Sequence, residues 1–322
     1  MKKLIGIVLS LMLCVLPLTA LATKTPYESG EVEIMDTPEG VYHYVLLGLD
    51  KQLKAGQTIP QTDVTIIVTL DTKNDRILLT SLMRDALIVR PNGNKGRING
   101  VARDFGSFNK KTGEYNLDAY METLSEHFGI KVDKWVSVDF DQVINVVDIL
   151  GGVEVTATKA EAQYFKDRGF DKIVIQEIPS AGTFMVSGFT ALQYMRIRKI
   201  SGGEFQRTQR QRTVLKTILK NAKDMTSDEA MSLVDRIAPN LSTNMSVIEL
   251  YEAAMRLYNM RSSLVQEVRI PIDGTWKNAT YANMAILDVN FGKNAKALQA
   301  YIKDPTIVPE DPSIAYKDIN FD

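Results

Sequence analysis

The chain has 322 residues, 45% of them hydrophobic, and its 39 acidic residues almost balance its 38 basic ones. A chain of this length and composition buries a substantial core, which excludes an intrinsically disordered protein. Because the charges nearly cancel, a strong electrostatic field has to come from a local cluster of charged residues and not from the whole molecule.

The first predicted element is an export signal in residues 1–22. Lys2 and Lys3 precede an uncharged apolar run that ends in the sequence ALA, which is typical of a secretory signal peptide with a small-residue cleavage site. The alternative is an uncleaved membrane anchor, because the run is about long enough to cross a bilayer. Either way we expect the rest of the chain to be extracytoplasmic: secreted, with a mature start near Thr23, or attached to the outer face of the cytoplasmic membrane.

Cysteine and histidine chemistry is largely excluded. The only cysteine, Cys14, lies in the export signal, so the mature protein has no thiol for disulfides, nucleophilic catalysis or metal binding. The two histidines, His43 and His127, border predicted strands and helices, and we interpret them as structural or solvated. A Ser-His-Asp hydrolase is therefore poorly supported.

After a polar linker, residues 23–40, the pattern of apolar residues predicts a layered α/β/α domain with a central mixed β-sheet. The predicted strands are residues 43–50, 63–70, 76–82, 134–140, 153–156 and 264–271. The predicted helices are residues 117–128, 141–150, 188–195, 204–223, 226–237, 246–260 and 292–303. No repeat or flexible linker divides residues 41–305, so we predict one domain followed by a C-terminal tail, residues 306–322.

The helix predicted at 141–150 is apolar enough to line a groove for a lipid, although an apolar helix in an α/β domain is more often part of the core. The residues concerned are Val143, Ile144, Val146, Val147, Ile149 and Leu150.

Residues 196–212 concentrate positive charge, with six cationic side chains and a single acid, Glu204. Such a stretch can bind nucleic acid, form a solvated helix face, or form a pocket for a concentrated anion such as pyrophosphate. Export disfavours nucleic acid as a partner. Arginine suits phosphate oxygens because its guanidinium is planar and permanently charged.

Helical periodicity separates the cations of this stretch into two groups. Arg207, Arg210 and Gln211 continue the stripe of Val214, Leu215 and Ile218, so they should face inward, at the N-terminal end of the helix, where backbone N–H groups add positive potential. Arg212, Lys216 and Lys220 lie on the opposite face and should be solvated. The inward arginines need an anion, either phosphate or the carboxylates of the protein itself, because a buried unpaired guanidinium is costly.

Five motifs resemble those of the LytR-CpsA-Psr (LCP) family, in the same order and at about the same spacing. They are LLGLD at 46–50, TDVTIIVTLD at 62–71, SLMRD at 81–85, RING at 97–100, and ALQYMRIR with GGEFQRTQRQ within 191–211. The resemblance implies an LCP ligase, a magnesium-dependent phosphotransferase that moves an anionic glycopolymer from a polyprenyl-pyrophosphate carrier to peptidoglycan. The polymer would be teichoic acid, capsule or a related wall polysaccharide.

The resemblance also implies a site. Asp50 and Asp63 would bind Mg²⁺, which prefers oxygen ligands, and Arg84 and Arg207 would be catalytic. The pyrophosphate would be bound by Arg84, Arg196, Arg198, Arg207, Arg210 and Gln211, with Asp85 orienting Arg84. The sequence departs from the family pattern at Gln61, Val64, Met83 and Glu204.

Two alternatives stay open at this point. A hydrolase of the same pyrophosphate-linked lipids would use water in place of the sugar hydroxyl. A non-catalytic envelope protein would bind polyprenyl phosphate and transfer nothing.

Overall fold

The computed structural model describes residues 32–49, 59–112, 114–200, 202–221 and 225–309. The predictions for the export signal and for Asp50 fall outside these residues. Within them, no helix is both long enough and apolar enough to cross a bilayer.

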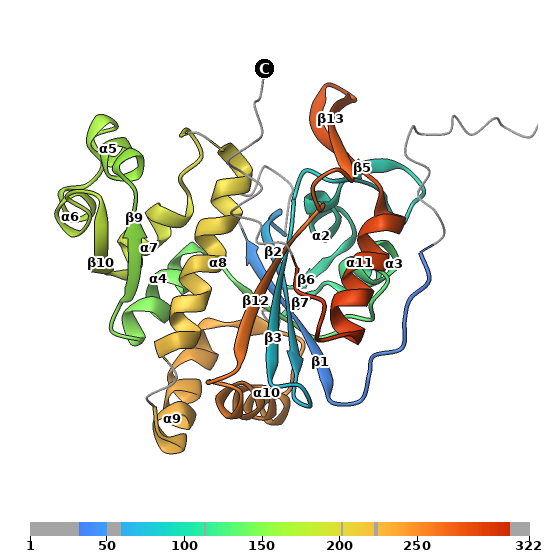
Figure 1. The fold of residues 1–322 in the computed structure, drawn as a ribbon, viewed down its shortest axis with the longest axis horizontal. Coiled ribbons are helices and arrows are strands. Elements are labelled where there is room, and N and C mark those ends of the chain that lie inside the picture. The colour runs from blue at the N-terminus through green and yellow to red at the C-terminus, as the bar shows by residue number, and fades with distance from the viewer. Residues whose placement is uncertain (1–31, 50–58, 113, 201, 222–224, 310–322) are drawn as a thin grey trace, which may run out of the picture.

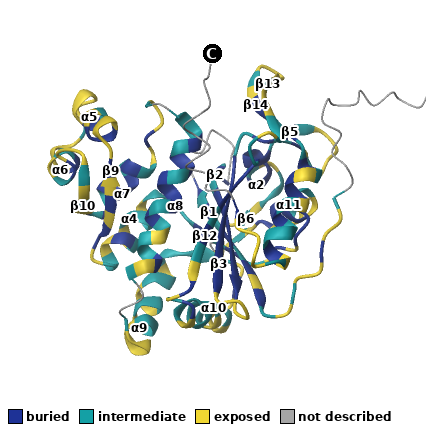
Figure 2. Ribbon diagram, in the orientation of Figure 1, coloured by how far each residue is buried: buried dark blue, intermediate teal, exposed yellow. Residues whose placement is uncertain are grey.

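A six-stranded mixed sheet forms the centre of the fold, in the strand order β11-β8-β1-β2-β3-β12. β1 pairs with β2 and β2 with β3 in antiparallel register, whereas β8 runs parallel to β1 and β12 parallel to β3. The strands are β1 Val41–Leu49, β2 Thr62–Asp71, β3 Arg76–Leu82, β8 Trp135–Val138, β11 Ser242–Thr243 and β12 Leu264–Ile270. β2 and β3 are almost continuously buried (Figure 2), because helices cover both faces of the sheet.

Helices lie on both sides of this sheet (Figure 1), which confirms the predicted layered α/β/α fold with a central mixed sheet. On one side are α2 Val101–Phe105, α3 Asp118–Phe128 and α11 Phe291–Lys303, and on the other are α4 Phe140–Ile149, α8 Gly203–Asn221, α9 Ser227–Ile237 and α10 Val247–Asn259. Tyr120, Leu124 and Leu298 fill the main hydrophobic core on the first side. On the second side Leu219 and Met260 pack with Ile66, Leu70 and Leu79.

A smaller layer with its own core adjoins α8 (Figure 1). Here the strand predicted at 153–156 pairs with a strand that the sequence did not predict, in a two-stranded sheet separate from the central one. The elements of this layer are β9 Val153–Ala157, α5 Lys159–Asp167, α6 Lys172–Glu177, β10 Gly182–Val186 and α7 Gly188–Met195.

Short strands and 3₁₀ turns complete the described chain. They form three further two-stranded sheets, β4 with β5, β6 with β7, and β13 with β14. Their bounds are β4 Leu87–Val89, β5 Lys95–Arg97, β6 Ser107–Asn109, β7 Glu114–Asn116, β13 Trp276–Tyr281 and β14 Met284–Val289, with 3₁₀ helices at Ile98–Gly100 and Ala238–Asn240.

α4 is less buried than a core helix. A capping box between Asp139 and Gln142 fixes its start, and of its residues only Val147 is buried. The other apolar side chains are half-buried, namely Val143, Ile144, Val146, Ile149 and the following Leu150. The interpretation of this helix as plain core is therefore wrong for most of its apolar residues.

His43 is a buried structural residue. It lies on β1, is 7% exposed, and its Nδ1 is 2.9 Å from the Thr69 hydroxyl. Burial lowers the pKa of His43 from 6.5 to about 4, against a smaller opposite effect of Asp133. Between these two pKa values the unfolded state binds a proton at His43 that the folded state does not bind. The free energy of unfolding is therefore unaffected by His43 above about pH 6.5 and decreases as the pH falls from there towards 4.

Between pH 7 and pH 5 the unmodified protein should lose about 1–2 kcal/mol more of its free energy of unfolding than a His43→Gln variant does. Urea unfolding at both pH values measures this difference. Burial also lowers the pKa of His127, so part of the acid sensitivity should remain in the variant. An identical loss of stability in both proteins would contradict the assignment to His43.

Candidate active site

The register of the central sheet brings an acid and an arginine together at one edge. Ile66 of β2 pairs with Ser81 of β3, and continuing that antiparallel register places Asp63 opposite Arg84. Gly48 allows β1 to lie close to β2 at this point, because a Cβ at position 48 would lie 2.8 Å from Cγ2 of Val64. The sheet thus positions Asp63 and Arg84 as neighbours.

The other charged side chains near Asp63 come from the first turn of α8 and from the segment that precedes it. Gly202 and Gly203 have φ angles of 95° and 48°, in the region that favours glycine, and they turn the chain into α8 as predicted. Arg207 is then inward, with its side chain 4% exposed, while Arg198 precedes the turn and is 42% exposed.

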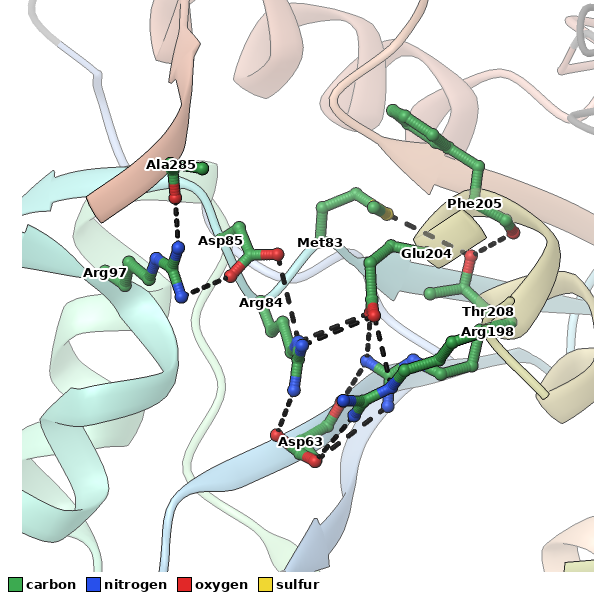
Figure 3. Close-up of polar contacts among 11 residues, drawn as sticks. Asp63, Met83, Arg84, Asp85, Arg97, Arg198, Glu204, Phe205, Thr208 and Ala285 are labelled. Atoms are coloured by element: carbon green, nitrogen blue, oxygen red, sulfur yellow. Dashed lines mark hydrogen bonds and ion pairs between the residues drawn. The ribbon is translucent and has the colours of Figure 1, made fainter. Parts of the chain in front are cut away.

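Asp63 is the acceptor at the centre of this cluster (Figure 3). Arg84 Nη1 donates to Asp63 Oδ1 at 2.6 Å and Arg198 Nη2 donates to Oδ2 at 3.1 Å. Arg207 Nη2 donates to the Asp63 backbone carbonyl at 3.1 Å. Three guanidinium groups from three separate segments therefore converge on one aspartate.

Glu204 is a second acid within the cluster, and we had assigned it no role from the sequence. Its carboxylate lies 3.3 Å from Arg84 Nε, 3.2 Å from Arg198 Nε and 2.6 Å from Arg207 Nη2. Its position as the single acid of the basic stretch was the signal that could have identified it. We call these five residues, Asp63, Arg84, Arg198, Glu204 and Arg207, the arginine cluster.

The pKa values reflect the competition between burial and ion pairing. Burial raises the pKa of Asp63, but Arg84, Arg207 and Arg198 outweigh it and hold the pKa below its usual value. For Arg84 burial acts to lower the pKa, and Asp63, Glu204 and Asp85 together raise it. Burial dominates at Arg207 and lowers its pKa to about 10, despite Glu204. Arg84 and Arg207 therefore stay charged at neutral pH.

A second layer of residues holds Arg84. Asp85 Oδ2 lies 3.8 Å from Arg84 Nε, and Asp85 Oδ1 lies 3.0 Å from Arg97 Nη1 (Figure 3). Arg97 in turn donates to the Ala285 carbonyl on β14. The predicted role of Asp85 as a partner that orients Arg84 agrees with this geometry.

Among the described residues, no side-chain hydrogen bond or ion pair joins three of the predicted pyrophosphate ligands to the arginine cluster. Arg196 is exposed and lies over the Phe140 ring at 4.4 Å. Arg210 is inward, as predicted, but Nε pairs with Glu161 at 2.6 Å and Nη1 donates to the Ile197 carbonyl at 3.0 Å. Gln211 is buried with 8% exposure. Their role in phosphate binding stays a prediction.

The prediction that Arg212 is solvated is wrong. Its side chain is 1% exposed, and its Nε pairs with Glu267 Oε2 of β12 at 2.8 Å. The physical reason is that the edge strand β12 covers this face of α8 and supplies the buried counter-charge. Lys216 and Lys220 are exposed, as predicted, although Lys216 also reaches Glu267 at 2.5 Å.

A cavity of about 660 Å³ lies towards the other end of α8. Its lining residues include Ile77, Thr213, Lys216, Leu257 and Val265. None of the predicted site residues lines this cavity. Thr213 is six residues beyond Arg207, about 9 Å along the helix axis. We therefore define the candidate site by the convergence of charges around Asp63 and not by this cavity.

The arginine cluster contains carboxylate oxygens that could bind a metal, but arginines already bind them. Among the described residues no three acids or histidines are grouped as a ready-made metal site. Asp63 has the carboxylate oxygens that Mg²⁺ prefers, but both oxygens are engaged by Arg84 and Arg198. A metal at Asp63 would therefore share these oxygens with the two arginines, through the lone pairs that the arginines leave open.

Comparison with known proteins agrees with the motifs. Over 247 residues the chain is 28% identical to a polyisoprenyl-teichoic acid–peptidoglycan teichoic acid transferase, TagT of Bacillus subtilis, across 76% of this chain and 71% of TagT. It is 28% identical to TagV of the same organism, but the match spans only about half (53%) of that protein.

The fold comparison points to the same proteins. The structure of TagT bound to LIIa-WTA superposes with a TM-score of 0.63 at 25% identity, covering 84% of this chain and 93% of the other. The sequence model described as the LytR_cpsA_psr family matches residues 17–297. With most of its length matched, this chain belongs to the LytR-CpsA-Psr family.

Proposed function

We propose that this protein is a magnesium-dependent phosphotransferase that moves an anionic glycopolymer from a polyprenyl-pyrophosphate carrier to peptidoglycan. The observation that carries the proposal is the arginine cluster, in which Arg84, Arg198 and Arg207 converge at one edge of the sheet. The likeness to TagT bound to LIIa-WTA and LI-WTA supports a substrate of the same kind.

The charges of the cluster suit a pyrophosphate accompanied by a divalent cation. Three guanidinium groups face two carboxylates, a surplus of one positive charge. A pyrophosphate diester, with a negative charge on each phosphorus, would reverse this sign, and a divalent cation would restore it. Neutralisation of this kind is the main way in which proteins accelerate phosphoryl transfer.

In the proposed reaction a peptidoglycan sugar hydroxyl attacks the phosphorus that carries the glycan. The new P–O bond forms as the bond to the polyprenyl phosphate breaks, and the hydroxyl proton leaves to a nearby carboxylate or water. Arg84 and Arg207 would bind the pyrophosphate oxygens and stabilise the charge on the leaving group. Asp63, together with Asp50, would hold Mg²⁺, which supplies further positive charge at the same oxygens.

The carrier lipid needs an apolar surface, and the half-buried side chains of α4 support one. Val143, Ile144 and Val146 are neither fully exposed nor fully buried. We propose that side chains of this kind contact the polyprenyl chain while the arginine cluster holds its pyrophosphate. The protein would then act at the surface of the cytoplasmic membrane.

A product analysis tests the proposal. Purified protein with polyprenyl-pyrophosphate-linked glycopolymer and Mg²⁺ should yield phosphodiester-linked polymer only when peptidoglycan is present. Free polymer phosphate formed equally well without peptidoglycan would identify a hydrolase instead. Binding of the donor with no product under either condition would identify a non-catalytic envelope protein.

A further inference from the structure

The hairpin β13–β14 has a two-residue turn and an exposed tip. Its six residue pairs run from Trp276–Val289 to Tyr281–Met284, and the connection is only Ala282-Asn283, with φ angles of 47° and 61°. This is the backbone of a tight two-residue hairpin turn. The hairpin stands out from the domain (Figure 1), and every residue from Thr280 to Asn283 is exposed. β13 and the turn bury little surface, whereas Ile286, Leu287 and Val289 of β14 are buried and anchor the hairpin.

The base of the hairpin is fixed to both sides of the arginine cluster. On the α8 side, the Trp276 ring packs on the Phe205 ring with centroids 5.0 Å apart, and Phe205 directly follows Glu204. On the β3 side, Leu287 N donates to the Asp85 carbonyl at 3.0 Å, and Asp85 directly follows Arg84. The hairpin is therefore an immediate extension of the candidate site.

One face of β13 is turned towards the first turn of α8. Because side chains alternate along a strand, Trp276, Asn278 and Thr280 share a face, and Trp276 shows its direction by its contact with Phe205. Trp276 is half-buried, and Asn278 and Thr280 above it are exposed. The opposite face carries Lys277 and Tyr281, which are also exposed.

The two faces differ in charge. The face with Trp276, Asn278 and Thr280 has no ionisable side chain on β13, whereas Lys277 on the other face lies 3.8 Å from Asp288. An uncharged face with an amide, a hydroxyl and an indole is complementary to a neutral sugar chain, whose hydroxyl and N-acetyl groups form hydrogen bonds and whose C–H groups pack on aromatic rings. It is not complementary to the anionic donor, which the arginine cluster suits.

We infer that the face formed by Trp276, Asn278 and Thr280 binds the acceptor, the glycan strand of peptidoglycan. This inference rests on the proposed function for the identity of the acceptor. The hairpin holds the strand beside the arginine cluster, so that a sugar hydroxyl reaches the phosphorus of a bound donor. Donor and acceptor are thus recognised by different chemistry: fixed positive charge for the pyrophosphate, and uncharged hydrogen-bonding groups for the glycan.

Co-sedimentation of the full chain with purified peptidoglycan, without donor or metal, tests the inference. The variant Asn278→Ala/Thr280→Ala should bind peptidoglycan roughly tenfold more weakly, which corresponds to the loss of two hydrogen bonds between uncharged groups. The matched control Lys277→Ala/Tyr281→Ala alters the opposite face of the same hairpin and should bind as the unmodified protein does. Both variants should keep its thermal stability and its affinity for inorganic pyrophosphate, because these positions are exposed.

Steady-state transfer provides a second measurement. In the Asn278→Ala/Thr280→Ala variant the KM for peptidoglycan should rise while kcat at saturating peptidoglycan stays unchanged. Equal losses in the two variants, a loss confined to the opposite face, or no binding of peptidoglycan by the unmodified protein would each overturn the inference. Face-specific binding of peptidoglycan without any transfer would refute the proposed function and leave standing only that this face binds the glycan strand.

Discussion

Replacing Arg207 with alanine should weaken pyrophosphate binding by about 2–5 kcal/mol, the cost of truncating one partner of a desolvated charge pair. The Arg207 side chain is 4% exposed and lies between Glu204 and Asp63, so no solvent compensates for its loss. Removing it also leaves two carboxylates with one cation fewer, which repels the ligand further. Calorimetric titration with pyrophosphate measures the loss of affinity.

Lys216→Ala is the matched control for Arg207→Ala. Lys216 lies on the same helix, but its side chain is 43% exposed and its partner is Glu267, away from the arginine cluster. Glu267 keeps its buried partner Arg212 when Lys216 is removed, so the loss of this half-exposed ion pair should not affect the ligand. If the two variants lose similar, small amounts of affinity, the anion does not bind at Arg207.

Replacing Asp63 with asparagine should reduce Mg²⁺-dependent transfer by at least about a hundredfold, the usual effect of removing one electrostatic contact to a transition state. Asparagine keeps the size of the side chain but not its charge, so it neither binds Mg²⁺ well nor holds Arg84 and Arg198 in place. The initial rate of transfer as a function of Mg²⁺ concentration measures the effect. We also expect a lower melting temperature for this variant, because three arginines lose their counter-charge.

Glu204→Gln separates loss of the metal from loss of the ion pairs. It also deprives the three arginines of a carboxylate, but we do not predict it to be a metal ligand. We expect its transfer rate to keep the Mg²⁺ dependence of the unmodified protein even if the rate itself changes. Full transfer by Asp63→Asn in magnesium would show that the metal lies elsewhere.

Local periodicity predicted the elements that position the site. β2 and β3 are recognisable as short apolar runs, whereas Asp63 and Arg84 at their ends were identified as site residues by the resemblance to the LCP motifs. Arg207 faces inward because the helical stripe continues into apolar residues. In both cases the determining residues are close in sequence.

Charge partners distant in sequence were not predictable. Arg212 is buried because Glu267 on β12 covers it, 55 positions later, and Arg210 is paired because α5 supplies Glu161, 49 positions earlier. A helical pattern shows which residues share a face, but a buried cation is tolerated only where the tertiary fold brings an acid to it. The sequence around an arginine does not show whether a distant acid will pair with it.

The hairpin β13–β14 escaped prediction for a different reason. Its turn is Ala282-Asn283, and both residues adopt the positive φ that sequence rules associate with Asn-Gly. Its first strand is mostly exposed, so it lacks the apolar alternation of a strand that packs on a core.

The position of β12 in the sheet has a consequence for how the molecule folds. β12 pairs in parallel with β3, and beside this pair the Ser263 hydroxyl meets Asp75, 188 positions earlier in the chain. Closing so large a loop is entropically costly and slow, and parallel pairing gives no local hairpin from which to start. Without β12 beside it, β3 would be an open edge strand and Arg212 would lack Glu267. A chain in which β12 has not paired thus exposes an edge that can pair with other chains, and β12 both closes that edge and supplies the buried counter-charge for α8.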